Sequence, residues 1–193
     1  SVPRAKALLD LYGYVDRDGD GWRDMPDGSP LVIRHRTETA LLTRELQVLW
    51  QKALDAVAIR GEFTQAPWQE NIKASRAGQL MMWSTGWVAA LPDASYFMDV
   101  LYGSNKGMSN HARFDLPEVN ALHERQRAMP DGPERFALVQ RAMKIGVAYM
   151  PMKATAHPIN NWMSHAGVVG YVPHPFIRDY WRNMDIEPAA RVD

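Results

Sequence analysis

The chain has 193 residues, of which 46% are hydrophobic and 23% charged, an ordinary composition for a globular protein with room for an apolar core. Lysine plus arginine and aspartate plus glutamate number 22 each, so the net charge of zero provides no field that favours nucleic acid or an anionic membrane as a partner. Cysteine is absent, which excludes disulfides and thiolate chemistry, and no apolar run approaches the roughly 18 residues of a membrane-spanning helix.

The first half of the chain alternates helical and strand-like patterns. Apolar periodicity and the positions of glycine and proline predict helices over residues 5–12, 39–57 and 67–77, and strands over residues 31–36, 59–65 and 80–84. In the longest of these helices, apolar residues recur at three- and four-residue steps, and we expect one buried stripe of Leu42, Leu46, Leu49, Trp50, Ala53 and Val57. Strands that alternate with helices predict an α/β layer rather than a bundle or a sandwich.

The second half begins with a loop-rich stretch over residues 91–114, and helices are predicted over residues 116–129 and 133–150. We expect the core face of the second of these helices to consist of Phe136, Val139, Met143, Val147 and Met150. Prolines, glycines and asparagines then interrupt the pattern, although aromatic residues continue to the end. The sequence therefore predicts an ordered body over residues 1–153 and an irregular tail over residues 154–193.

An acidic loop follows the first predicted helix. Its spacing matches that of a calcium-binding loop at Asp16, Asp18, Asp20, Gly21, Trp22, Asp24 and Asp27. A hard cation needs clustered oxygen ligands, and the glycine permits a sharp turn. However, the last position carries Asp27 instead of the longer glutamate, and Pro26 and Gly28 beside it are typical of a plain turn. We favour a solvated turn, and calcium is the alternative.

Several stretches, taken in order, resemble the C-terminal part of the family 5 extracellular solute-binding proteins, which include oligopeptide, dipeptide and nickel binders. The similar stretches are Ala5-Lys6-Ala7-Leu8-Leu9 with Gly13-Tyr14, Asp16 to Arg23, Asp27-Gly28-Ser29-Pro30-Leu31, Ser84-Thr85-Gly86-Trp87 with Pro92-Asp93, Pro133-Glu134-Arg135, and Met150-Pro151-Met152. The long helix and the strand that begins at Ile59 also fit the pattern of this family. The resemblance extends over about residues 3–185, and it depends on the order and spacing of the motifs more than on any one of them.

The resemblance implies a lobe of the type II periplasmic-binding-protein kind, with a mixed sheet flanked by helices. The protein is then the substrate-binding component of a bacterial ABC importer, located in the periplasm, with a peptide or other small molecule as ligand and an inner-membrane permease as partner. The ligand lies between two lobes, and hinge closure buries it. Residues 1–153 then form most of the C-terminal lobe, and residues 154–193 pack toward an N-terminal lobe that this chain lacks. No enzymatic activity and no cofactor are implied.

The resemblance also implies where the ligand binds. Trp87, beside a glycine turn, is predicted to stack on the ligand, and Trp83, Asp93 and Tyr102 are further candidates. Trp83 fits a strand core position equally well. In peptide-binding relatives, the third residue after this tryptophan is typically an aspartate that holds the N-terminal ammonium of the peptide, and here it is Ala90. We therefore expect a ligand without a free α-ammonium at this point, or a clamp supplied elsewhere.

The sequence allows two other classes of function. One is a calcium-binding structural module built on residues 16–27, and the other is a hydrolase. The spacings of His157, His165 and His174 place them on no common helical face, and neither a His-Glu-x-x-His nor a Gly-x-Ser-x-Gly motif occurs. Metal-dependent or serine-dependent hydrolysis is therefore disfavoured, and the methionines on helical stripes are read as core residues.

Overall fold

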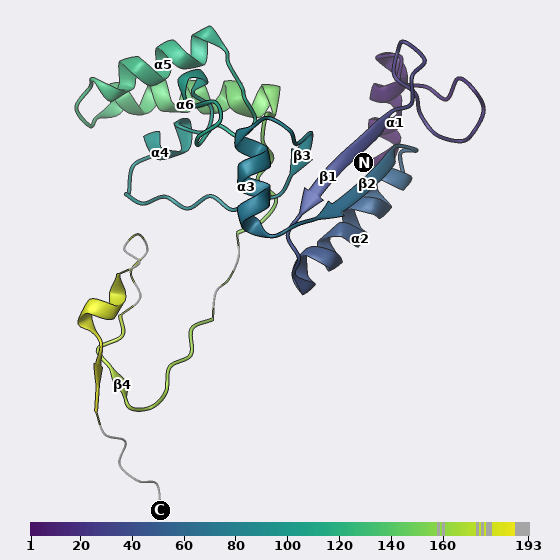
Figure 1. Cartoon of the computed structure of the whole chain (residues 1–193). Coiled ribbons are helices and arrows are strands. Elements are labelled where there is room, and N and C mark those ends of the chain that lie inside the picture. The colour runs from purple at the N-terminus through teal and green to yellow at the C-terminus, as the bar shows by residue number, and fades with distance from the viewer. Residues whose placement is uncertain (158, 160, 173, 175, 177–178, 188–193) are drawn as a thin grey trace, which may run out of the picture. The chain divides into compact units, whose positions relative to one another are not determined.

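The computed structural model describes residues 1–157, 159, 161–172, 174, 176 and 179–187. The chain divides into two compact units, Ser1–Gly86 and Trp87–Asp193 (Figure 1). This division does not coincide with the boundary predicted at residue 153. The packing of residues 154–193 toward another lobe stays a prediction, and part of that tail lies outside the described residues. Across the described chain, no helix combines the length and the hydropathy needed to cross a bilayer.

The first unit is a small parallel sheet with helices. Its elements are α1 (Val2–Leu11), β1 (Val32–Thr37), α2 (Leu41–Asp55), β2 (Arg60–Gln65), α3 (Trp68–Arg76) and β3 (Met82–Trp83). The strand order is β2-β1-β3, and β1 pairs in parallel with both neighbours (Figure 1). The predicted α/β class is confirmed, as are the six predicted elements, with bounds shifted by a few residues. The strands of this sheet are all parallel.

The order of the strands determines the faces on which the helices lie. The chain passes from β1 through α2 to β2, and then returns across β1 through α3 to β3. Crossovers between parallel strands are right-handed, so two crossovers that run in opposite directions place α2 and α3 on opposite faces of the sheet. With this strand order, the topological switch point, the position at which ligands bind in open α/β sheets, lies at the carboxyl end of the central strand β1.

Helix α2 does not bury the stripe that its sequence predicts. Leu42, Leu46 and Leu49 are exposed by 66%, 47% and 61%. The side of α2 that is shielded in this unit contains Trp50, a member of the predicted stripe, and Leu54, which is not one; both are half-buried. Periodicity correctly predicts the helix, but a helix with apolar residues on two adjacent sides does not by itself specify which side meets the sheet.

The second unit is mainly helical. Its elements are α4 (Ser95–Met98), η1 (Gly103–Asn105), α5 (Pro117–Arg127), α6 (Pro133–Tyr149), β4 (Val168–Val169), η2 (Tyr180–Asn183) and β5 (Asp185–Ile186). The two predicted helices, now α5 and α6, are confirmed and pack on each other. Strands β4 and β5 form an antiparallel pair. An apolar core is built around these helices by Met98, Val100, Leu101, Val119, Leu122, Val139 and Ala142.

Small residues determine which face of α6 is buried. The buried positions are Val139, Ala142 and Gly146, whereas Phe136, Val147 and Met150 are exposed, so the predicted core face was wrong except at Val139. A Cβ atom on Gly146 would lie 2.6 Å from Cδ1 of Leu101. Close approach of α6 to the Leu101 segment therefore requires small side chains, and a periodicity that counts only large apolar residues misses this face.

Candidate ligand-binding site

The carboxyl ends of β1 and β2 are tied together by one buried side chain. Asn71 of α3, fully buried, donates its amide Nδ2 to the carbonyl of Thr37 at 3.1 Å and to that of Ala66 at 3.0 Å. Its Oδ1 and the hydroxyl of the buried Thr37 have no hydrogen-bond partner among the described residues. Buried polar atoms without partners are uncommon in folded proteins. These two oxygens therefore mark the switch point as a place with unfilled hydrogen-bonding capacity.

His35 connects the same strand to the segment that follows β3. Its ring is 2% exposed and lies edge-on to Trp50 and Phe63, and its Nε2 is 2.9 Å from the hydroxyl of Ser84. Burial lowers the pKa of His35, so the imidazole is neutral at pH 7. The amide of Ser84 also donates to the carbonyl of Arg36 at 3.3 Å. The start of the Ser84-to-Trp87 segment is thus held on β1.

Two tryptophans cover this part of the first unit. Trp83 of β3 is half-buried, and its ring lies 5.7 Å from that of Trp68 of α3 at an interplanar angle of 34°. Trp68 is 41% exposed. Trp83 therefore packs within the unit, as a strand core residue does, and borders the partly exposed ring of Trp68. Its contact with a ligand stays a prediction.

Trp87 opens the second unit and is half-buried beside the apolar core. Its ring lies 5.6 Å from that of Tyr96. The indole Nε1 is shielded from solvent and has no acceptor among the described residues. Ala90, three residues further on, is exposed. The stacking of Trp87 on a ligand stays a prediction, but part of the ring is already used in packing.

Asp93 is engaged by the protein itself. Its carboxylate accepts two hydrogen bonds from Nη2 of Arg135, at 3.0 and 2.9 Å, and one from the amide of Ser95 at 2.8 Å. The Ser95 amide and the Arg135 guanidinium lower the pKa of Asp93. Arg135 also pairs with Asp131, and these residues line a cavity of about 300 Å³. The Asp93 carboxylate is therefore ionised, and its negative charge is already balanced by Arg135.

Tyr102 is likewise used in an internal contact. Its hydroxyl donates to Glu124 at 2.8 Å, and its ring lies 4.4 Å from that of the buried His123. Among the described residues, no hydrogen bond or ring contact joins Trp87, Asp93 and Tyr102 to one another. The structure therefore gives each of these predicted site residues its own partners within the second unit.

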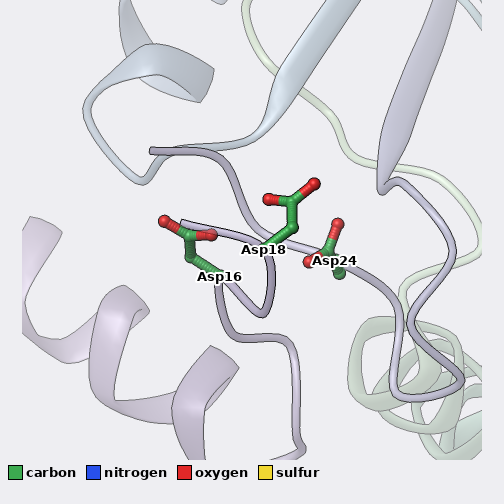
Figure 2. A group of neighbouring side chains, drawn as sticks. All are labelled: Asp16, Asp18 and Asp24. Carbon is green, nitrogen blue, oxygen red and sulfur yellow. The ribbon is translucent and has the colours of Figure 1, made fainter. Parts of the chain in front are cut away.

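The acidic loop gathers three of its carboxylates. The side chains of Asp16, Asp18 and Asp24 lie near one another, with one ligand oxygen from each within 4.8 Å of the others (Figure 2). Asp16 accepts from the amides of Gly19 and Gly21 at 2.7 and 2.9 Å. Both glycines have positive φ angles of 80° and 89°, which other residues rarely adopt. The loop is thus shaped by turns that its own aspartates cap.

The other predicted calcium ligands have different partners. Asp20 forms an ion pair with Arg60, whose guanidinium lies over the ring of Trp22. Asp27 accepts from the amide and hydroxyl of Ser29 at 3.0 and 2.7 Å, and these hydrogen bonds lower its pKa. With one ligand oxygen from each, the three clustered carboxylates provide half or less of the six to eight oxygens that calcium takes. This arrangement fits a self-capped turn better than the predicted ligand set, and calcium binding stays a prediction.

The sequence alone does not single out Arg36, Thr37, Asn71 or His35. A signal exists, since His35-Arg36-Thr37 places three polar residues at the end of a strand that is central in its sheet. Central parallel strands are usually apolar throughout. Without the strand order, however, nothing in the sequence shows that this strand is the central one.

Comparison with known proteins identifies the family of this chain. Residues 1–109, more than half of the chain, match the family model described as "Bacterial extracellular solute-binding proteins, family 5 Middle". Heme-binding protein A of Haemophilus influenzae is 30% identical over 186 residues, which are 95% of this chain and 32% of that protein. Di/tripeptide-binding protein 2 of Pseudomonas aeruginosa is 29% identical over 184 residues, 93% of this chain and 32% of that protein.

Solved structures share the fold. The oligopeptide-binding protein AppA from Bacillus subtilis, in complex with a nonapeptide, matches with a TM-score of 0.78 at 18% identity, over 96% of this chain and 37% of AppA. The chain spans about a third of the length of the curated relatives that it matches.

Proposed function

We propose that this chain, which belongs to family 5 of the bacterial extracellular solute-binding proteins, supplies one lobe of a longer binding protein of an ABC importer. In this proposal the protein works in the periplasm, holds a peptide or another small molecule, and delivers it to an inner-membrane permease. The observation that carries the proposal is the match to the family model over residues 1–109. The similarity of the chain, over nearly its full length, to a heme-binding and a di/tripeptide-binding protein supports it.

The switch point at the carboxyl end of β1 is the part of the first unit best suited to meet a ligand. Open α/β sheets bind ligands there because helices leave on opposite faces and open a crevice between the strand ends. The unfilled oxygens of Thr37 and Asn71 and the exposed Trp68 ring lie on the elements that form this edge. These groups can hydrogen-bond and stack, which supports a binding role without covalent chemistry.

The finer proposal concerns the charge of the ligand near Ala90. This position has no carboxylate, and Asp93, three residues on, is neutralised by Arg135. An enclosed ammonium group without a counter-charge would cost several kcal/mol, which corresponds to orders of magnitude in affinity. We therefore infer that the ligand does not present a free α-ammonium to this segment. Introducing Ala90→Asp into the longer protein should fail to improve binding of the natural ligand.

Direct binding measurements test the proposed function. The longer protein and the isolated chain are titrated with heme, di- and tripeptides and longer peptides, and binding is followed by calorimetry. We expect one of these classes to bind the longer protein tightly and the isolated chain weakly, because affinity comes from enclosure by two lobes. Absence of binding in every class, or equal and tight binding by both proteins, would contradict the proposal.

A further inference from the structure

Arg135, near the start of α6, joins three separate segments of the second unit. Its Nη2 donates to both carboxylate oxygens of Asp93, its Nη1 pairs with Asp131, and its Nε donates to the carbonyl and Oε1 of Gln126 at 3.2 and 3.1 Å. Gln126 is fully buried in the last turn of α5, and the side chain of Arg135 is only 15% exposed. A guanidinium holds its donors in one rigid plane, so these acceptors are fixed relative to one another.

The segment that leads from Trp87 to Asp93 has few contacts of its own at its carboxyl end. Residues 87–92 belong to no helix or strand and make no backbone hydrogen bond among the described residues. Beside Asp93 lies the cavity of about 300 Å³, which Pro92, Ala94 and Phe136 also line, so close packing is incomplete there. The ion pair with Arg135 is therefore the main attachment of this end of the segment.

Asp93 connects this attachment to Trp87 through α4. Its carboxylate accepts from the amide of Ser95 at 2.8 Å, and its carbonyl accepts from the amide of Tyr96 at 3.2 Å, so Asp93 fixes the first turn of α4. The ring of Tyr96 lies 5.6 Å from that of Trp87, which also packs on the apolar core. Arg135, Asp93, Tyr96 and Trp87 thus form one connected series within the second unit.

We propose that Arg135 is a positioning residue for ligand binding, which holds Asp93 and α4 so that the Trp87 ring keeps the orientation in which it meets the ligand. The proposal rests on the proposed function and on the predicted stacking of Trp87. Arg135 does not itself contact the ligand, because all three guanidinium nitrogens have acceptors within the chain. A segment that is ordered in advance does not have to be ordered at the moment of binding, so the attachment increases affinity.

Three variants weaken the attachment in different ways. Arg135→Met keeps the length of the side chain and removes its charge and donors. Asp93→Asn is nearly isosteric and keeps an oxygen for the amide of Ser95, but it lacks the charge. Arg135→Lys keeps the charge without the planar set of donors, so we expect a partial effect. Arg141→Met is the matched control, because Arg141 lies on the same helix and pairs with Glu118 at the surface, where their side chains are 66% and 48% exposed.

Two measurements on the longer protein separate positioning from stability. Trialanine and hemin, which represent the peptide and heme classes, are titrated by calorimetry. Fluorine NMR of the ligand-free protein labelled with fluorotryptophan reports on Trp87, whose resonance is identified by its loss in Trp87→Phe. Arg135→Met and Asp93→Asn should each move or broaden this resonance and weaken the probe that binds by roughly tenfold or more. The double variant should bind no more weakly than the weaker single variant, because both remove the same ion pair. Arg141→Met should change neither measurement.

Other outcomes overturn the proposal. If the folded variants keep the Trp87 resonance in its wild-type position, or if Arg135→Met binds the probe as tightly as the wild type, Arg135 serves stability alone and the proposed function stands. If the losses of the single variants multiply in the double variant, Asp93 does not carry the effect and the proposal fails. If the wild type binds neither these probes nor longer peptides, both proposals fail. Should Arg135→Met not fold, Asp93→Asn and Arg135→Lys decide the outcome by the same two measurements.

Discussion

The two units of this chain have interiors of opposite character. In the second unit, the buried side chains form an apolar cluster around α5 and α6, with Met98, Val119 and Ala142 fully enclosed. In the first unit, the buried residues are mostly polar, among them Arg23, His35, Thr37 and Asn71, while leucines of α2 are exposed. The second unit also buries Asn110, His123 and Gln126, and shielded polar atoms without partners among the described residues occur in both units, so the difference between them lies in the apolar core. An apolar interior stabilises a unit by itself, and only the second unit has a sizeable one.

The largest expected effect is a difference in stability between two variants, each of which loses one apolar side chain, one variant in each unit. Met98→Ala should destabilise the protein by about 2–5 kcal/mol, because the fully buried side chain leaves a cavity in the core. Leu46→Ala on α2 should change the free energy of unfolding of the isolated chain by about 0.5 kcal/mol or less, since Leu46 is 47% exposed. Urea unfolding of both variants measures the difference. Equal losses would show that the leucine face of α2 belongs to a core.

A second test concerns the close approach of α6 to the Leu101 segment. Gly146→Val should cost about 1–3 kcal/mol, because its Cβ alone would overlap Leu101. Gly132→Ala is the control, since no atom lies within 4 Å of the added Cβ and the backbone there is extended. Thermal unfolding of the two variants should show a clear loss for the first and almost none for the second. A tolerated valine would contradict the packing of α6 through small residues.

Acid should weaken both units through their buried histidines. Burial lowers the pKa of His35 and of His123 in the folded state, although Asp99 opposes the shift of His123. Each folded pKa lies below the unfolded value of about 6.5, so the unfolded chain binds more protons as the pH falls. Stability is therefore full above about pH 6.5 and declines below it, by at most about 1.4 kcal/mol per pH unit for each histidine.

The histidine prediction is tested by urea unfolding between pH 7 and pH 5. His35→Gln and His123→Gln should each reduce the dependence of stability on pH, whatever they do to stability at pH 7. A pH dependence that is unchanged in both variants would show that these histidines are not the groups that bind protons on unfolding.

The smallest expected effect is that of calcium on the acidic loop. Because Asp20 pairs with Arg60 and Asp27 with Ser29, we expect millimolar calcium to give no heat in calorimetry and no shift of the thermal midpoint. A clear shift that a chelator reverses and that Asp18→Asn abolishes would contradict this expectation and favour the calcium alternative.

The sequence predicts the elements better than it predicts their surroundings. The helices and strands of the first unit follow from local periodicity, as for α2. The order and spacing of the sequence motifs, including the one at Trp87, indicate the correct protein family. The exposed face of α2 could not be predicted, because burial depends on which elements lie opposite. Asp93 and Tyr102 stay predictions as ligand contacts, and their partners within the chain, Arg135 and Glu124, lie far away in the sequence.

Amide hydrogen exchange on the longer protein, with and without a saturating ligand found in the calorimetric screen, tests the central claim most directly. The account predicts that the ligand slows exchange at the end of β1 and in the Ser84-to-Trp87 segment, while exchange in the α5 and α6 core is nearly unchanged. Slowed exchange confined to α5 and α6, with no change at Arg36, Thr37 and Ser84, would show that the first unit does not contact the ligand.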